Sequence, residues 1–289
     1  MTQTMTPAIA ILPSATLLVG NWPEIACDAL EWPLGQPERL RGKRLRDMER
    51  TDHLIAYPRN DMHIRPFLKL KARLSIMVQE PRTIHGHHRR ALRVTWRKFF
   101  RVFSHDRSFV DSIPNGVFVP FGTTWVPGWR DVPTEKTKDC SIIASAKRSQ
   151  VGHNLRHRII ERVRTEGLDV DAMGGGYVPF AEKSDGLAPY RYSVVIENVR
   201  EPNYFSEKLI DPLLCLTVPI YWGCPNIADY LDTGAMIICE SEADIMAALS
   251  RMSQADYAAR LPALRALRPV AASYDNLHDR TISALLASL

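Results

Sequence analysis

Short apolar runs recur along the whole chain, and polar stretches with a different spacing separate them. The runs are rich in valine, isoleucine and aromatic residues, which favours buried β-strands. In the first half we expect strands at Thr16–Trp22, His53–Tyr57, Leu74–Gln79, Arg101–Ser104 and Val117–Phe121. In the second half we expect strands at Ser141–Ser145, Val170–Met173, Tyr192–Ile196, Val218–Trp222 and Ala235–Cys239.

Several of the intervening segments show helical spacing, in which apolar residues return every three or four positions. They predict helices at His153–Thr165, Tyr204–Leu216, Glu242–Met252 and Ala255–Leu267. Strands that alternate with helices indicate parallel sheets built from βαβ units, so the predicted fold class is α/β.

The pattern breaks near residues 124–138, where prolines, a glycine and mixed charges precede the next strand. This composition is typical of a linker between domains. We therefore predict two α/β domains, residues 1–130 and residues 131–289, that face each other across a cleft. The helices from Ala255 onward are candidates to cross back to the N-terminal domain.

Composition narrows the class of protein. No apolar run is long enough for a membrane span. We interpret the apolar patches of Met5–Gly20 as the first buried strand and its lead-in rather than a signal peptide. The five cysteines lie far apart without a CxxC pair, which favours a reducing, cytoplasmic compartment over a disulfide framework or zinc site.

The positive charge is concentrated in the first half. Residues 1–135 hold 20 Lys/Arg against 13 Asp/Glu (+7), and residues 136–289 hold 17 against 19 (−2). Within Arg82–Arg107, eight basic residues and four histidines meet one acid, Asp106. One interpretation is a helix whose aromatic residues pack inward while its arginines face water. The other is a peripheral surface for anionic lipid or a phosphate-bearing acceptor. No nucleic-acid-binding motif accompanies the charge, so no nucleic-acid partner is expected.

Polar residues follow the predicted strand Tyr192–Ile196, which ends in Glu197 and Asn198. In an open α/β sheet, ligands bind beyond the carboxyl ends of the strands. Asn203 is a candidate N-cap for the next helix, with Glu207 and Lys208 close behind it. Free amides and the positive end of the helix dipole favour an anion at this position. A lysine there can reach a phosphate, and a carboxylate can bind ribose hydroxyls.

The stretch YSVVIENVREPNYFSEKLIDPLLCLTVPIYWGCPNIADYLD, at residues 192–232, carries a family resemblance. It resembles the donor-binding core of the α1,3/α1,4-fucosyltransferases, glycosyltransferase family ten. The shared pattern is a strand ending in Glu-Asn, an aromatic residue six positions on, Glu-Lys, a helix, and V/I-P-I/V-x-x-G. Ser145-Ala146-Lys147, Gly152–Arg158 and the triple glycine Gly174–Gly176 extend the resemblance, which is good over Ile142–Cys239 and weaker over the first 135 residues.

The resemblance implies a GT-B-type enzyme with two Rossmann-like domains. It would transfer a sugar from GDP-fucose to a hydroxyl of a glycan or glycolipid acceptor, with inversion and without a metal or other cofactor. The N-terminal domain would lie on the acceptor side. The C-terminal domain would bind the nucleotide sugar. A shortened loop between Gly176 and Tyr190 keeps another nucleotide-sugar donor open as an alternative. A basic nucleic-acid- or membrane-binding protein with a degenerate transferase domain is a second alternative.

Carried over by position, Arg156 and Lys208 would neutralise the pyrophosphate. Tyr204, Glu207 and Asn198 would hold the ribose, phosphate or sugar. Each has a plain structural alternative. The Glu207–Lys208 pair could be a solvated helix pair, and Asn198 could cap a turn. Three other cations compete with Arg156 for the phosphate, namely Lys147, Arg148 and Arg158.

Two further carboxylates belong to the predicted site. Glu197 is a candidate for donor binding, or a structural carboxylate that accepts hydrogen bonds from backbone amides. Inversion also requires a base for the acceptor proton. We assign this role to Glu80, which ends the predicted strand Leu74–Gln79 and precedes Pro81.

Three patterns could suggest a metal, and we expect none of them to bind one. His153, His157 and Glu161 share a helical face but lack a second motif half. Asp169-Val170-Asp171 matches a D-x-D pattern that is common by chance. The remaining pattern is a histidine cluster that we assign to a solvated basic loop, made of His85, His87 and His88.

Overall fold

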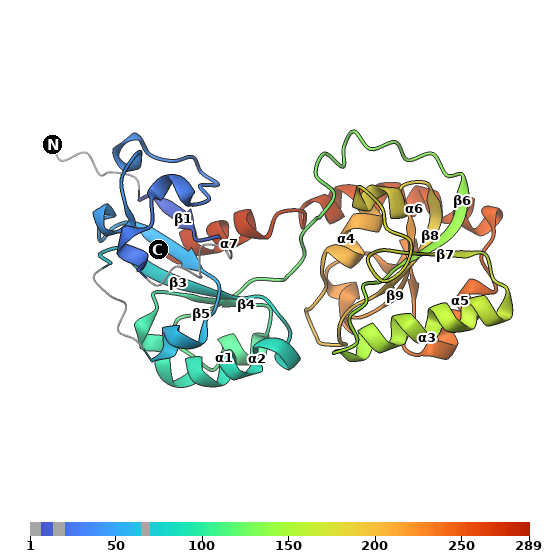
Figure 1. Ribbon diagram of the computed structural model, residues 1–289, viewed down its shortest axis with the longest axis horizontal. Helices are drawn as coiled ribbons and strands as arrows, with labels where there is room; N and C mark the ends of the chain where they lie inside the picture. The colour runs from blue at the N-terminus through green and yellow to red at the C-terminus, as the bar shows by residue number, and fades with distance from the viewer. Residues whose placement is uncertain (1–6, 14–20, 65–69) are drawn as a thin grey trace. The chain divides into compact units, whose positions relative to one another are not determined.

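The chain forms two compact α/β units, each built on a parallel sheet (Figure 1). The computed structural model describes residues 7–13, 21–64 and 70–289. The first unit contains Met1–Val119 and His278–Leu289, and the second contains Pro120–Leu277. Residues 120–130, which we assigned to the N-terminal domain, are therefore part of the second unit. The predicted α/β fold class is confirmed by the two parallel sheets.

The sheet of the first unit has five strands in the order β1-β2-β3-β4-β5. All neighbouring strands in it are parallel. Their bounds are β1 Ile9–Ile11, β2 His53–Ala56, β3 Arg73–Val78, β4 Val102–Ser104 and β5 Gly116–Phe118. β1 lies inside Met5–Gly20, where we placed the first buried strand. Of the strand predicted at 16–22, residues 16–20 lie outside the described residues, and Trp22 begins a 3₁₀ helix.

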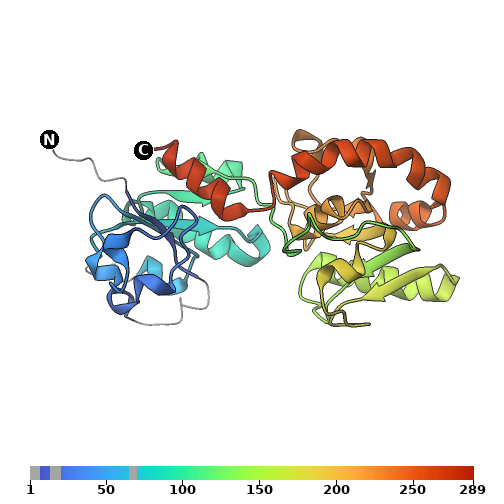
Figure 2. The same ribbon diagram turned by 90° about the horizontal axis from the view of Figure 1, so that it is seen from above.

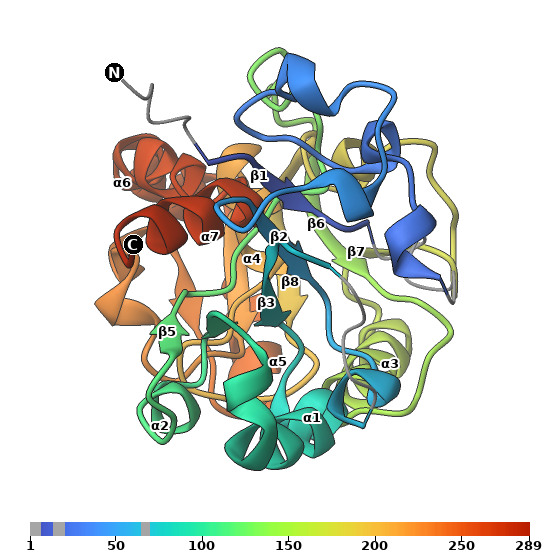
Figure 3. The same cartoon turned by 90° about the vertical axis from the view of Figure 1, so that its left-hand side faces the viewer.

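Helices cover both faces of this sheet, because alternate residues of its strands point to opposite sides. Helices α1 (Arg82–Thr95) and α2 (Arg107–Val110) lie on one face, and α7 (Leu277–Leu286) lies on the other (Figure 3). Ile76 and Val78 of β3 join the apolar core that includes Leu92 of α1. The hydroxyl of Thr281 on α7 lies 3.2 Å from Sδ of Met77. The last helix is thus part of the first unit.

The sheet of the second unit also has five strands, in the order β10-β9-β8-β6-β7. All of its neighbouring strands are parallel. The strands are β6 Lys138–Ile143, β7 Val170–Met173, β8 Tyr190–Ile196, β9 Val218–Trp222 and β10 Ile237–Ile238. Each overlaps a predicted strand. The strand order reverses between β6 and β8, and open α/β sheets bind their ligands at such a point.

Four helices pack on this sheet (Figures 1 and 2). They are α3 Val151–Glu166, α4 Glu207–Leu214, α5 Glu242–Leu249 and α6 Gln254–Ala272. α3 and α5 lie on one face, and α4 and α6 lie on the other. Within the described ranges of the chain, no helix is both long enough and apolar enough to cross a membrane.

Candidate functional site

The end of strand β8 fixes the start of helix α4 through Glu197. This side chain is fully buried, and its carboxylate accepts hydrogen bonds from the backbone N–H and the hydroxyl of Ser206, both at 2.7 Å. Burial raises the pKa of Glu197 above its ordinary value, although Lys208 nearby opposes this shift. Because both carboxylate oxygens have partners inside the protein, the geometry favours the structural alternative for this residue.

Helix α4 begins later than we predicted. Its N-cap is Ser206, whose hydroxyl accepts a hydrogen bond from the N–H of Lys208 at 3.3 Å. The predicted N-cap, Asn203, instead adopts a φ of +62°, a left-handed conformation that asparagine tolerates well. Its backbone N–H and side-chain oxygen bond the side chain of Asn226, in the turn after β9. Spacing alone could not distinguish the two caps, because both are good N-cap residues.

Glu207 and Lys208 form an ion pair at this helix start, with 2.9 Å between Oε1 and Nζ. The Glu207 side chain is 6% exposed and that of Lys208 is 26% exposed, so the pair is not a solvated surface pair. Burial alone would raise the pKa of Glu207, but the ammonium groups of Lys208 and Lys183 outweigh it and the pKa is lowered. The pair is therefore ionised at neutral pH.

Arg156 of α3 reaches the same end of β8. Its buried guanidinium donates to the carbonyl of Ile196, with Nε at 2.9 Å, and to Oδ1 of Asn198 at 3.1 Å. Its pKa is lowered by burial, while Glu197, Glu207 and Tyr204 oppose the shift. Two predicted site residues, Arg156 and Asn198, are thus in direct contact.

The competing cations lie elsewhere. Lys147 and Arg148 are exposed in the loop before α3, and Arg158 forms an ion pair with Glu242 at 2.8 Å. Close packing brings this loop and helix to the end of β8, since the N–H of Gly152 donates to the carbonyl of Asn198 at 2.9 Å. A Cβ at Gly152 would lie 1.7 Å from the Glu197 carbonyl oxygen, so this position requires glycine.

Tyr204, also assigned to donor binding, is 2% exposed. Its ring lies 5.4 Å from that of Phe121 in the same unit. It lies two positions before Ser206, the N-cap of α4. The structure therefore brings together Arg156, Asn198, Tyr204, Glu207 and Lys208 at the carboxyl end of β8.

Two charged residues of this site were missed from the sequence. Lys183 lies 2.6 Å from Oδ2 of Asp211 and 3.9 Å from Oε1 of Glu207. Asp211 is fully buried, and burial raises its pKa although Lys183 opposes this shift. The spacing of Glu207 and Asp211, four positions apart on one helix, could have indicated a shared face. Lys183 begins a short 3₁₀ helix, Lys183–Gly186, and no sequence pattern singles it out.

Together these residues form a buried charge cluster of three carboxylates and three cations. We call it the α4 cluster: Glu197, Glu207, Asp211, Arg156, Lys183 and Lys208. Charges taken out of water must be paired, and here each carboxylate has at least one cation nearby. The cluster thus holds three cations in fixed positions near a helix N-terminus, where backbone N–H groups favour an anion.

Residues of the patterns that could suggest a metal have other partners in the structure. His157 contacts the Tyr177 hydroxyl at 2.6 Å through Nδ1 and the Lys147 carbonyl at 3.2 Å through Nε2. Both of its ring nitrogens thus contact protein groups. The ring connects the loop before α3 with Tyr177, which follows Gly174–Gly176. Among the described residues, no group of three or more His, Cys, Asp or Glu is arranged to hold a metal ion.

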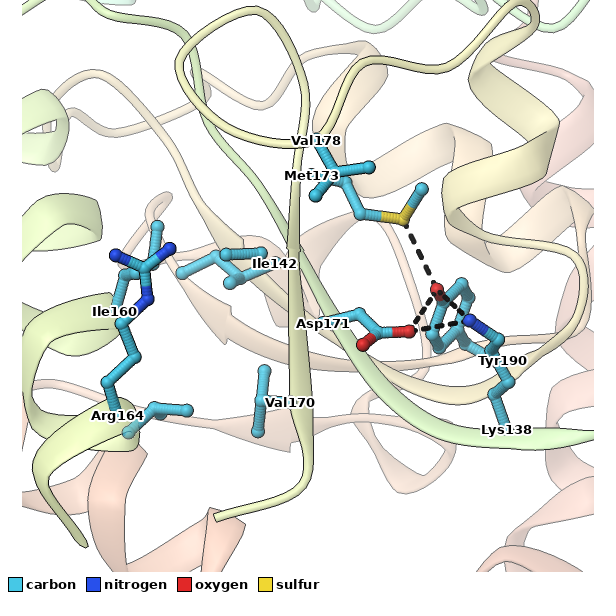
Figure 4. Close-up of a pocket in the computed structure, with 11 residues that line it drawn as sticks. Lys138, Ile142, Ile160, Arg164, Val170, Asp171, Met173, Val178 and Tyr190 are labelled. Carbon is cyan, nitrogen blue, oxygen red and sulfur yellow. Dashed lines mark hydrogen bonds and ion pairs between the residues drawn. The ribbon is translucent and has the colours of Figure 1, made fainter. Parts of the chain in front are cut away.

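Asp171, of the D-x-D pattern, lies beside a cavity of about 290 Å³ at the edge strand β7 (Figure 4). Its carboxylate pairs with the Lys138 ammonium at 2.7 Å and accepts a hydrogen bond from the Tyr190 hydroxyl at 2.7 Å. These contacts lower its pKa, through Lys138 first. Asp169 does not line this cavity, which shares no residue with the α4 cluster.

In the first unit, Glu80 follows the carboxyl end of β3, the central strand of the sheet. It is half-buried, and its backbone carbonyl accepts a hydrogen bond from Nη2 of Arg89 at 2.9 Å. Arg89 is buried beside Asp106, which also pairs with Arg82 at 2.7 Å. The Asp106 carboxylate thus organises the region around Glu80.

The basic segment Arg82–Arg107 begins with helix α1. Arg90, Arg93, Arg97 and Lys98 are exposed, and so is Val94, which is 79% exposed. We call this surface the α1 basic face. Its exposed arginines match the interpretation in which the arginines of this segment face water.

The neighbouring histidines differ from our prediction of a solvated loop. His85, His87 and His88 lie within α1, and His88 is buried. The His88 ring contacts His63 at 2.9 Å between Nδ1 and Nε2. Burial lowers the pKa of His85 to about 4 and that of His88 to about 3. These two rings are therefore neutral at pH 7.

Comparison with known proteins gives the same answer as the residue pattern. The chain is 39% identical over 46 residues to the α-(1,3)-fucosyltransferase FucT of Helicobacter pylori, which is 16% of this chain and 10% of that protein. It is 37% identical over 79 residues to α-(1,3)-fucosyltransferase B of Drosophila melanogaster, covering 27% and 16% of the two chains. No family model matches the chain.

The chain resembles the α1,3-fucosyltransferases. The matched part covers less than one fifth of the length of each of these two relatives. Structural similarity to known proteins covers more of the chain than sequence similarity does. TarM of S. aureus superposes with a TM-score of 0.55 at 10% identity, over 82% of this chain and 54% of TarM. This is the GT-B glycosyltransferase fold, with two Rossmann-like units.

Proposed function

We propose that the protein is an inverting glycosyltransferase that moves fucose from GDP-fucose to a hydroxyl of a glycan acceptor. The observation that carries the proposal is the Glu207–Lys208 pair, buried at the start of α4 with Arg156 and Asn198 beside it. The similarity to α1,3-fucosyltransferases supports fucose as the transferred sugar.

The chemistry follows from the charge that develops on the leaving group. When the bond between the anomeric carbon and the diphosphate breaks, negative charge grows on the departing nucleoside diphosphate. Fixed cations stabilise that charge most where water is excluded. We assign Lys208 and Arg156 to the diphosphate. We assign Glu207, Asn198 and Tyr204 to the ribose and the sugar.

Direct displacement with inversion also needs a group that accepts the proton of the attacking hydroxyl. We propose Glu80 for this role. It lies at the carboxyl end of the central strand of the first unit, and ligands of open α/β sheets bind at this edge. Neither step requires a metal, because the cations that stabilise the leaving group are side chains.

A second donor class has an observation of its own. Glycosyltransferases of the same fold bind UDP, since TarM of S. aureus has been crystallised in complex with UDP and superposes with a TM-score of 0.55. The experiment that separates the two is calorimetry with GDP-fucose, GDP-mannose and UDP-sugars. Selective binding of a UDP-sugar would exclude fucose transfer, and binding of none of them would exclude the transferase assignment.

We further propose that the acceptor belongs to a glycan or glycolipid at a membrane surface, and that the α1 basic face contacts anionic lipid there. Its support is the row of exposed cations around Val94. Basic residues next to an exposed apolar side chain favour the headgroup region of an anionic bilayer. The five free cysteines support a cytoplasmic location.

A further inference from the structure

Trp125 is the most unusual exposed side chain near the α4 cluster. It is 63% exposed and is the only exposed aromatic side chain among the described residues. Tryptophan has a large apolar surface, and burying that surface would lower the free energy of the folded state substantially. An exposed tryptophan therefore calls for an explanation.

The backbone that carries Trp125 is firmly held. Its N–H donates a hydrogen bond to Oδ1 of Asp211 at 3.1 Å, and the hydroxyl of Thr124 donates to the same oxygen at 2.6 Å. The next residue, Val126, is buried in the core of the second unit. Because Asp211 is itself fully buried, the indole projects from a fixed anchor rather than from the tip of a loose loop.

One ammonium group connects the indole to the site. Nζ of Lys183 lies 5.0 Å from the centre of the Trp125 ring, 2.6 Å from Asp211 and 3.9 Å from Glu207. The ring and the Glu207 carboxylate are thus neighbours of the same cation. Glu207 is the carboxylate that we assign to the ribose, and the base of a nucleotide is one glycosidic bond from its ribose.

We propose that Trp125 is the stacking surface for the nucleobase of the sugar-nucleotide donor, which rests on the proposed function. The exposed part of the indole would cover one face of the base while Glu207 holds the ribose and Lys208 the phosphates. Stacking of a base on an aromatic ring needs no matched hydrogen-bond pattern, since every base has a flat π-face. Trp125 therefore contributes affinity for the nucleoside half of the donor.

The test is the affinity for GDP and for UDP, measured by calorimetry without acceptor on the full chain. Trp125→Ala is compared with Trp125→Phe, which keeps a flat ring, and with Val270→Ala, an exposed apolar residue on α6 of the same unit. We expect Trp125→Ala to weaken binding of the diphosphate that the wild type binds by about tenfold or more. Trp125→Phe should restore much of the affinity, and Val270→Ala should leave it unchanged.

Tryptophan fluorescence gives an independent readout. Stacking of the base should quench emission in the wild type, and Trp125→Phe should lose that quenching while it still binds. Unchanged affinity of Trp125→Ala would overturn the proposal. So would a loss of affinity that accompanies a lower unfolding temperature and that Trp125→Phe does not restore. If the wild type binds neither diphosphate, the proposed function fails instead, whatever Trp125 does.

Discussion

The two units place their charges in opposite ways. In the second unit, three cations and three carboxylates meet in the α4 cluster, where Asp211 and Glu197 are fully buried. In the first unit, helix α1 and the 3₁₀ turn after it carry five exposed cations, and the nearby carboxylate, Asp106, pairs with Arg82 and Arg89. Buried, paired charges are fixed in space, whereas exposed charges of one sign attract a partner from any direction.

The difference is consistent with the two kinds of recognition that we propose. The α4 cluster can select a small ligand by geometry, because its cations cannot move far without losing their carboxylate partners. The charges of the α1 basic face are exposed, so salt screens their electric field. Such charges suit an extended anionic surface better than a single small ligand. Substitutions confined to one unit separate these two roles.

The largest effect is expected at Glu80. Glu80→Gln keeps the size of the side chain but cannot accept the acceptor proton, so turnover should fall about 1,000-fold. Donor binding, which we assign to the other unit, should stay unchanged. Initial rates and calorimetry on the same preparation check both statements. Full turnover by Glu80→Gln would mean that another group is the base.

Lys208→Ala should weaken GDP binding about 100-fold, because it removes a cation from the diphosphate and leaves Glu207 with fewer partners. Lys208→Arg keeps the charge and is the matched control. Arg158→Ala, on α3 two positions after Arg156 but paired with Glu242, should bind GDP normally. If Lys208→Ala, Lys208→Arg and Arg158→Ala all bind GDP as tightly as the wild type, the α4 cluster does not bind the diphosphate.

The α1 basic face should affect lipid binding only. The double substitution of Arg93 and Arg97 by Gln should weaken binding to vesicles of anionic lipid about 30-fold, at roughly 1 kcal/mol per cation. Binding of the wild type should decrease at high salt, and GDP affinity should not change. Vesicle sedimentation measures the first effect. Equal binding to neutral vesicles would exclude this role for the face.

A smaller effect concerns pH. Burial lowers the pKa of His88 to about 3 from an ordinary 6.5, so the unfolded chain binds a proton there between these values and the folded chain does not. Stability contributed by the neutral ring is therefore present above pH 6.5 and lost as the pH falls, at about 1.4 kcal/mol per pH unit. His88→Gln should show a shallower fall in unfolding free energy between pH 6.5 and pH 4.5 than the wild type. A slope for His88→Gln equal to that of the wild type would exclude His88 as the cause.

The parts of the structure that depend on local pattern were predictable. Strand Val218–Trp222 matches its predicted bounds, because β-branched and aromatic residues fill a short buried run. Strand Val170–Met173 also matches its predicted bounds, although its residues are only half-buried. The proximity of Glu197 to Lys208, 3.9 Å between Oε2 and Nζ, followed from a motif and from the rule that ligands bind at strand ends.

Contacts between distant segments were not predictable. Lys183 pairs with Asp211 from a 3₁₀ helix 28 residues earlier in the chain, and the backbone N–H of Trp125 donates to Asp211 from 86 residues away. No local spacing signals such pairs. The start of α4 was misplaced for a related reason, since Asn203 is drawn into the left-handed region by its bonds to Asn226, a residue 23 positions later.

The placement of α7 has a consequence for biosynthesis. Its residues 278–286 complete a unit whose other part ends at Val119, so the ribosome must translate the whole of the second unit before the first can close. Domains usually fold in the order in which they emerge from the ribosome. Here the second unit can complete its folding first, while the sheet of the first unit still lacks the helix that covers one of its faces.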